Sequence, residues 1–106
     1  GVECVDLDAL ESAEPPTADA AVTRTPGRAA VVLTADCLPI FIASRNGSVV
    51  AVVHAGWRGL AAGVIDRTVQ RMSVDPSVLV ARFGPAIGSA AFEVAPERRD
   101  AVVRRA

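Results

Sequence analysis

The chain has 106 residues, of which 51% are hydrophobic and 22% are charged. This composition is typical of one ordinary globular domain and excludes a disordered segment. Eleven arginines, no lysine and twelve acidic residues leave a net charge of −1, which excludes the basic surface of a general nucleic-acid binder. No apolar run reaches the roughly 18 residues of a membrane span, and no secretory signal pattern is seen. We therefore expect a cytoplasmic protein with neither nucleic acid nor membrane as its partner.

The first third of the chain predicts short strands separated by polar loops. Residues 2–5 alternate as a strand does, and the polar, proline-containing stretch 6–17 predicts a surface loop. Residues 18–23 fit either a short strand or a helical turn. A turn is expected at Pro26-Gly27, and the continuous apolar run 29–34 predicts a strand buried on both faces.

The centre of the chain predicts a β-hairpin. Two β-rich runs, 38–45 and 48–54, flank Asn46-Gly47. An Asn-Gly pair favours a two-residue type I′ turn, because both central residues of that turn need positive φ. In such a hairpin, residues that face each other have numbers that sum to 93.

The remainder of the chain alternates helix and strand. Apolar residues recur at helical spacing over 60–72, which predicts an amphipathic helix that ends at Asp75-Pro76-Ser77. Residues 78–83 predict a strand, 84–89 a tight loop, and Pro96 onward a second helix. Because a strand opens the sequence and a helical pattern closes it, we expect 1–106 to be a single domain that is incomplete at both ends.

The hairpin register brings together the two side chains with the most reactive chemistry. His54 faces Pro39, and Cys37 lies two residues beyond Pro39 on the same face, so Cys37 and His54 are diagonal neighbours. A zinc ion bound to a sulfur and a nitrogen at about 2.3 and 2.0 Å spans such a pair. The alternative interpretation is a small buried cysteine beside a hydrogen-bonded surface histidine.

A catalytic zinc normally has three protein ligands, and only Cys37 and His54 have support from the register. Cys4 is the other cysteine, but a core position is the better prediction for it. We expect the third ligand to lie outside these 106 residues.

Two glycine-rich loops adjoin this pair. The segment from Gly56 to Gly59 leads into the predicted helix, so its backbone N–H groups, together with Arg58, could bind phosphate or carboxylate. Arg58 could equally be a solvated surface residue, and Trp57 either a core residue or a stacking platform. The loop from Gly84 to Gly88 is a candidate wall of the same site, although a tight turn alone explains its residues. For Asp36, a role in a turn is the better prediction.

Four segments together are highly specific: Thr34 to Pro39 (TADCLP), His54 to Gly59 (HAGWRG), Gly84 to Gly88 (GPAIG) and Phe92 to Val94 (FEV). In this order they resemble the YfiH-like family, also called the laccase-domain or polyphenol oxidase family and, in newer usage, purine nucleoside phosphorylase. The stretch 18–23 resembles that family as well. Phosphate-loop, C-x-x-C, H-E-x-x-H and G-x-S-x-G motifs are absent.

The resemblance implies an α/β (α+β) fold with mixed β-sheets, a central hairpin and flanking helices, similar to the cytotoxic necrotizing factor fold. It also implies one zinc ion held by two His and one Cys, of which Cys37 and His54 match two. The third family ligand precedes a glycine that Gly1 resembles, so it would stand immediately upstream of this sequence. Phe92 stands where the family often has Tyr.

The activities that the resemblance implies are phosphorolysis of adenosine, inosine, guanosine or 5′-methylthioadenosine, and adenosine deamination. The partners would be a purine nucleoside and phosphate, with Arg58 and the glycines Gly56, Gly59, Gly84 and Gly88 around them. Copper-dependent phenol oxidation is the alternative, disfavoured because a multicopper site needs many His ligands and the sequence has one. An inactive or regulatory module and a Cys37–His54 hydrolase or deamidase remain further alternatives. The sequence leaves dimerisation open.

Overall fold

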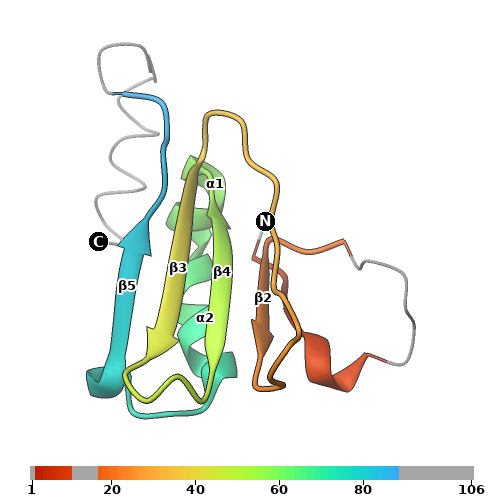
Figure 1. Cartoon of the computed structure of the whole chain (residues 1–106). Coiled ribbons are helices and arrows are strands. Elements are labelled where there is room, and N and C mark those ends of the chain that lie inside the picture. The colour runs from red at the N-terminus through yellow and green to blue at the C-terminus, as the bar shows by residue number, and fades with distance from the viewer. Residues whose placement is uncertain (1, 11–16, 89–106) are drawn as a thin grey trace.

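The computed structural model describes residues 2–10 and 17–88, which form one five-stranded sheet with both α-helices behind it (Figure 1). Along the chain the elements are as follows: β1 (Cys4–Asp6), the 3₁₀ turn η1 (Leu7–Ala9), β2 (Ala20–Thr23), β3 (Leu38–Ser44), β4 (Val50–Ala55), α1 (Trp57–Ala62), α2 (Val64–Met72), the 3₁₀ turn η2 (Pro76–Val78) and β5 (Leu79–Phe83). The strand order is β1-β2-β4-β3-β5. Only β1 and β2 are parallel, so the sheet is mixed, as predicted.

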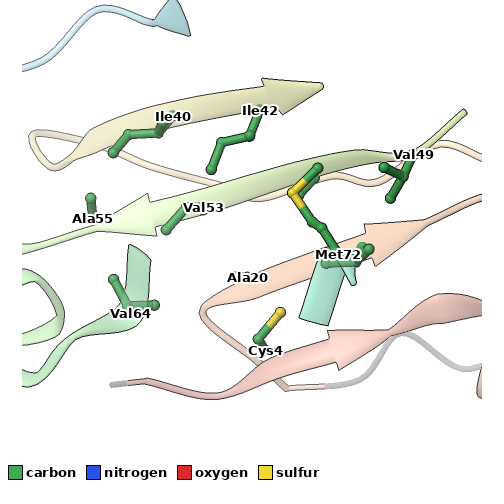
Figure 2. Close-up of a cluster of buried hydrophobic side chains, with 11 residues drawn as sticks. Cys4, Ala20, Ile40, Ile42, Val49, Val53, Ala55, Val64 and Met72 are labelled. Carbon is green, nitrogen blue, oxygen red and sulfur yellow. The ribbon is translucent and has the colours of Figure 1, made fainter. Parts of the chain in front are cut away.

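Alternate residues of the central strands decide which face of the sheet is buried. The even residues of β3 and the odd residues of β4 face the helices, where they meet Val64 and Met72 of α2, neither of which is exposed to solvent (Figure 2). Cys4 joins this core at 5% exposure, as predicted, and its burial raises the pKa of its thiol. The core is built from small side chains: Cys4, Ala20, Val22, Ile40, Ile42, Val49, Ala51, Val53, Ala55, Val64 and Met72.

The hairpin has the predicted register but a different turn. Pro39 pairs with His54 and Ile40 with Val53, so the pairs sum to 93. The N–H of Ser44 donates to the carbonyl of Val49 at 3.0 Å, which leaves a loop of four residues, 45–48, instead of two. Within it Gly47 alone has positive φ (74°), and its N–H donates to the carbonyl of Ser44 at 2.9 Å. The type I′ prediction was wrong because the Ser44 hydroxyl accepts the N–H of Val49 at 3.2 Å, which lets a wider loop satisfy its backbone groups.

The predicted helix 60–72 is two helices. The first begins earlier, at Trp57, and the break falls at Gly63, whose φ of 93° belongs to the left-handed region. This conformation ends α1, and glycine adopts it without the steric cost that a Cβ would bring. Ser73, at φ 56°, ends α2 in the same left-handed conformation although it carries a side chain.

Two other predictions have different outcomes. The ambiguous stretch 18–23 contains strand β2. Residues 29–34 form no strand, and Leu33 is 90% exposed. The prediction failed because a continuous apolar run shows only that the segment suits burial, and no neighbouring strand pairs with it among the described residues. The loop at 84–88 and strand 78–83 are confirmed within one residue, whereas the helix from Pro96 and residues 11–16 of the predicted loop 6–17 lie outside the described residues. None of the described helices is long and apolar enough to cross a membrane.

Candidate functional site

Cys37 and His54 lie at one end of the sheet. We call this the upper end, as it is drawn in Figure 1: β1, β2 and β3 begin there, and β4 and β5 end there. His54 is the penultimate residue of β4 and pairs with Pro39. Cys37 directly precedes β3 and stands against Gly56, because a Cβ built on Gly56 would lie 3.3 Å from the Cys37 Sγ. The thiol therefore lies beside the residue two positions after His54, which is the diagonal arrangement that the register predicts.

The two faces of the sheet separate His54 from the hydrophobic core. Val53 and Ala55 point into the core beneath the helices, so His54 between them points to the opposite face, which we call the outer face. Its side chain is half-buried, and its backbone N–H donates to the carbonyl of Asp19 at 2.7 Å. Cys4 belongs to the core on the helix side, so it does not complete a site with His54.

The loop 84–88 is hydrogen-bonded to the peptide that carries Cys37. The N–H of Gly84 donates to the carbonyl of Pro39 at 2.9 Å, and the N–H of Ile87 donates to that of Asp36, also at 2.9 Å. These two bonds bracket Cys37 on both sides. The structure therefore places this loop against the segment that carries Cys37, and it gives Asp36 a backbone role that the sequence had not suggested.

Gly84 allows this loop to approach the strand closely. A Cβ on Gly84 would lie 2.7 Å from Cγ of Pro39 and 3.4 Å from Cε2 of Phe41. The first distance is shorter than real Cβ contacts, so a side chain at position 84 would force the loop or the start of β3 to shift. By contrast, a Cβ on Gly88 would meet nothing within 4 Å.

The start of α1 presents a cationic side chain near the same end. Arg58 is exposed, and its guanidinium carbon lies 5.1 Å from the centre of the Trp57 ring, a distance at which cation and ring attract each other. The helix has only six residues, so its N-terminus adds little to an anion site. Gly59 is buried within α1, where its carbonyl accepts the N–H of Gly63. Its place in the helix therefore explains this glycine without a role in the site.

Cys37, His54, Gly56 and Gly84 thus meet at the upper end of the sheet, with Arg58 on the helix that follows. Among residues 2–10 and 17–88, no three His, Cys, Asp or Glu side chains come close enough to hold a metal together. A cysteine and an imidazole are ordinary zinc ligands, so the donor types fit zinc, but any third ligand has to come from elsewhere.

This sequence is similar to known proteins over most or all of its length. Residues 1–106 match the family model described as "Multi-copper polyphenol oxidoreductase laccase". The chain belongs to this laccase-domain family. A purine nucleoside phosphorylase of Xylella fastidiosa (strain Temecula1) is 48% identical over 109 residues, which cover 99% of this chain and 42% of that protein. Purine nucleoside phosphorylase YfiH of Escherichia coli (strain K12) is 51% identical over 84 residues, 79% of this chain and 35% of that protein.

Two solved structures have the same fold as this chain. The Neisseria meningitidis protein NMB0706 superposes with a TM-score of 0.80 at 47% identity, over 86% of this chain and 38% of that one. YlmD from Geobacillus stearothermophilus gives a TM-score of 0.69 at 32% identity, over 81% of this chain and 33% of that one. The chain therefore spans less than half the length of these relatives and of these two structures.

Proposed function

We propose that these residues form part of an enzyme that cleaves purine nucleosides with phosphate, with Cys37 and His54 as two ligands of one zinc ion. The observation that carries the proposal is the placement of the Cys37 thiol beside Gly56, diagonal to His54, at one end of the hairpin. Relatives named purine nucleoside phosphorylase, about half identical to this chain, supply the substrate class.

The topology supports a third ligand immediately upstream of Gly1. The carbonyl of Glu3 accepts the N–H of Asp19 at 2.8 Å, and the carbonyl of Asp19 in turn accepts that of His54. Val2 and Glu3, which precede β1, therefore lie at the same end of the sheet as His54, one strand beyond β2. A ligand placed there needs no rearrangement of the sheet.

Each site residue then has a distinct task. Cys37 as thiolate and His54 as neutral imidazole would hold the zinc, which when bound supplies a Lewis acid for phosphorolysis or for adenosine deamination. Arg58 would bind phosphate through its planar guanidinium. Gly56 and Gly84 keep side chains away from Cys37 and Pro39, so backbone atoms would border the bound zinc and substrate there.

A phosphorolysis assay tests the proposal in a protein of the family's full length that carries these residues. We expect phosphate-dependent release of base from inosine or adenosine and one zinc per chain. Cys37→Ala and His54→Ala should each lose both the base release and the zinc, whereas Cys4→Ala, which removes a core thiol, should keep its zinc. Unchanged zinc content and turnover in Cys37→Ala would refute the proposal. Loss of zinc binding in the 106-residue chain, restored by N-terminal extension, would locate the third ligand.

The family description favours one competing function, copper-dependent oxidation of phenols. The single histidine of this sequence argues against several copper ions held by these residues. Copper in stoichiometric amounts with a blue absorbance would favour this alternative. If Cys37 were instead a nucleophile activated by His54, thiol alkylation would be rapid both before and after chelation, because no metal would shield the sulfur.

A further inference from the structure

Residues 29–35 have the exposure pattern of a β-strand without a strand partner. Their side chains alternate between exposed at odd positions and half-buried at even ones, which is the period of an extended backbone. Val31 is 68% exposed and Leu33 90%. Within the described parts of the chain, no backbone hydrogen bond involves these seven residues. Unpaired N–H and C=O groups flanked by apolar side chains are a template for another strand.

The segment is held at both ends. Before it, Arg28 donates from Nη1 to the carbonyl of Leu7 at 3.0 Å and to Oδ1 of Asp8 at 2.9 Å. After it, the carbonyl of Asp36 accepts the N–H of Ile87. Between these points the chain climbs from the lower end of β2 to the start of β3 (Figure 1). Because its ends are fixed, an incoming strand would have less backbone freedom to restrict.

The outer face of the sheet continues this apolar surface. Ala29 and Ala30 line a groove of about 380 Å³ with outer-face residues of the sheet. Phe41 and Val80, two of these, are 51% and 49% exposed. Adjoining apolar side chains at such exposure mark a surface that another part of a protein covers. The rim carries Arg28 and Arg82.

We propose that residues 29–35 are a strand of a second β-layer over the outer face, paired with polypeptide from the part of full-length family members that lies outside the aligned region. This chain spans 42% of the Xylella relative and 38% of the Neisseria structure, so more than half of such a protein is available as the partner. A second copy fits less well, because pairing one strand with its twin covers an edge and leaves Leu33 and the groove exposed.

Hydrogen exchange compares the 106-residue chain with a family-length protein that contains it. We expect amides 29–35 to exchange freely in the short chain and at least about 100-fold more slowly in the long one. Leu33→Lys should leave the melting temperature of the short chain unchanged and lower that of the long protein by at least about 4 °C. Gln70→Lys adds the same charge at an exposed position of α2 and should change neither melting temperature.

Three results would overturn the proposal. One is free exchange of amides 29–35 in the long protein. Another is a melting temperature that Leu33→Lys leaves unchanged in the long protein. The last is slow exchange of amides 29–35 in the short chain that becomes slower with protein concentration, together with a dimer in sedimentation. That result would make the partner a second copy of the chain. None of these readouts depends on nucleoside turnover or zinc, so the result stands apart from the proposed function.

Discussion

Replacement of Gly84 by alanine tests how the loop 84–88 positions Cys37. The added Cβ would lie 2.7 Å from Cγ of Pro39, about 0.7 Å short of the 3.4 Å at which ordinary contact begins. Cγ belongs to a closed ring that cannot rotate aside, so the loop or the start of β3 has to move. Overpacking of this kind costs about 1–3 kcal/mol.

Gly88→Ala is the matched control because it lies in the same loop and a Cβ there meets nothing within 4 Å. Both variants reduce the freedom of the unfolded chain, which by itself stabilises by about 0.4–1 kcal/mol at an unstrained position. The difference between their free energies of unfolding in urea therefore isolates the contact at Pro39. We expect Gly84→Ala to be the less stable of the two by about 1–3 kcal/mol.

A second measurement connects this contact to the site. Displacement of Pro39 strains the hydrogen bond from Gly84, one of the two that bracket Cys37. We therefore expect iodoacetamide to alkylate Cys37 at a changed rate in Gly84→Ala and at the parental rate in Gly88→Ala, with buried Cys4 unreactive in both. Equal stability and equal alkylation rates in the two variants would refute the reasoning.

Three further predictions concern the rest of the fold. Hydrogen bonds from the Thr23 hydroxyl and the Arg24 N–H lower the pKa of Asp8 to about 2, so its contribution to stability is present above the unfolded pKa near 4 and is lost as pH falls toward 2. Melting curves of Asp8→Asn should accordingly show a deficit at pH 6 that disappears near pH 2; a constant deficit would count against these bonds. Gly63→Ala forces a side chain into the left-handed region at φ 93° and should cost about 1–2 kcal/mol in urea unfolding, and no loss would contradict the observed break between α1 and α2. Met72→Ala empties a fully buried position and should cost about 2–5 kcal/mol, whereas Leu33→Ala in the 106-residue chain should change stability by less than about 0.5 kcal/mol.

Part of the candidate site was predictable from local sequence, and part depends on contacts between distant segments. The pairing of Pro39 with His54, which places Cys37 diagonal to His54, was predictable because an antiparallel register depends only on where the two strands turn back. Replacing a two-residue loop by a four-residue loop centred on the same point leaves every pair unchanged. The hydrogen bonds from Gly84 and Ile87 were not predictable, since they depend on β5 pairing with β3, and nothing within either segment specifies that neighbour.

For the stretch 29–34, the sequence predicted the local conformation but not the pairing. Its β-branched residues predict an extended backbone, and the alternating exposure of 29–35 agrees with that. Whether an extended segment becomes a strand depends on a partner for its N–H and C=O groups, which local composition cannot supply.

The amino-acid sequence by itself determined the fold class, the hairpin register, the core position of Cys4, the family, and the two residues proposed to bind zinc. These follow from side-chain periodicity and short motifs, which act over a few residues. Only the tertiary structure decided the strand order, the break at Gly63, the outer-face position of His54 and the close approach of Gly84 to Pro39. Those features arise from contacts between segments distant in the chain, whose energies depend on which surfaces meet.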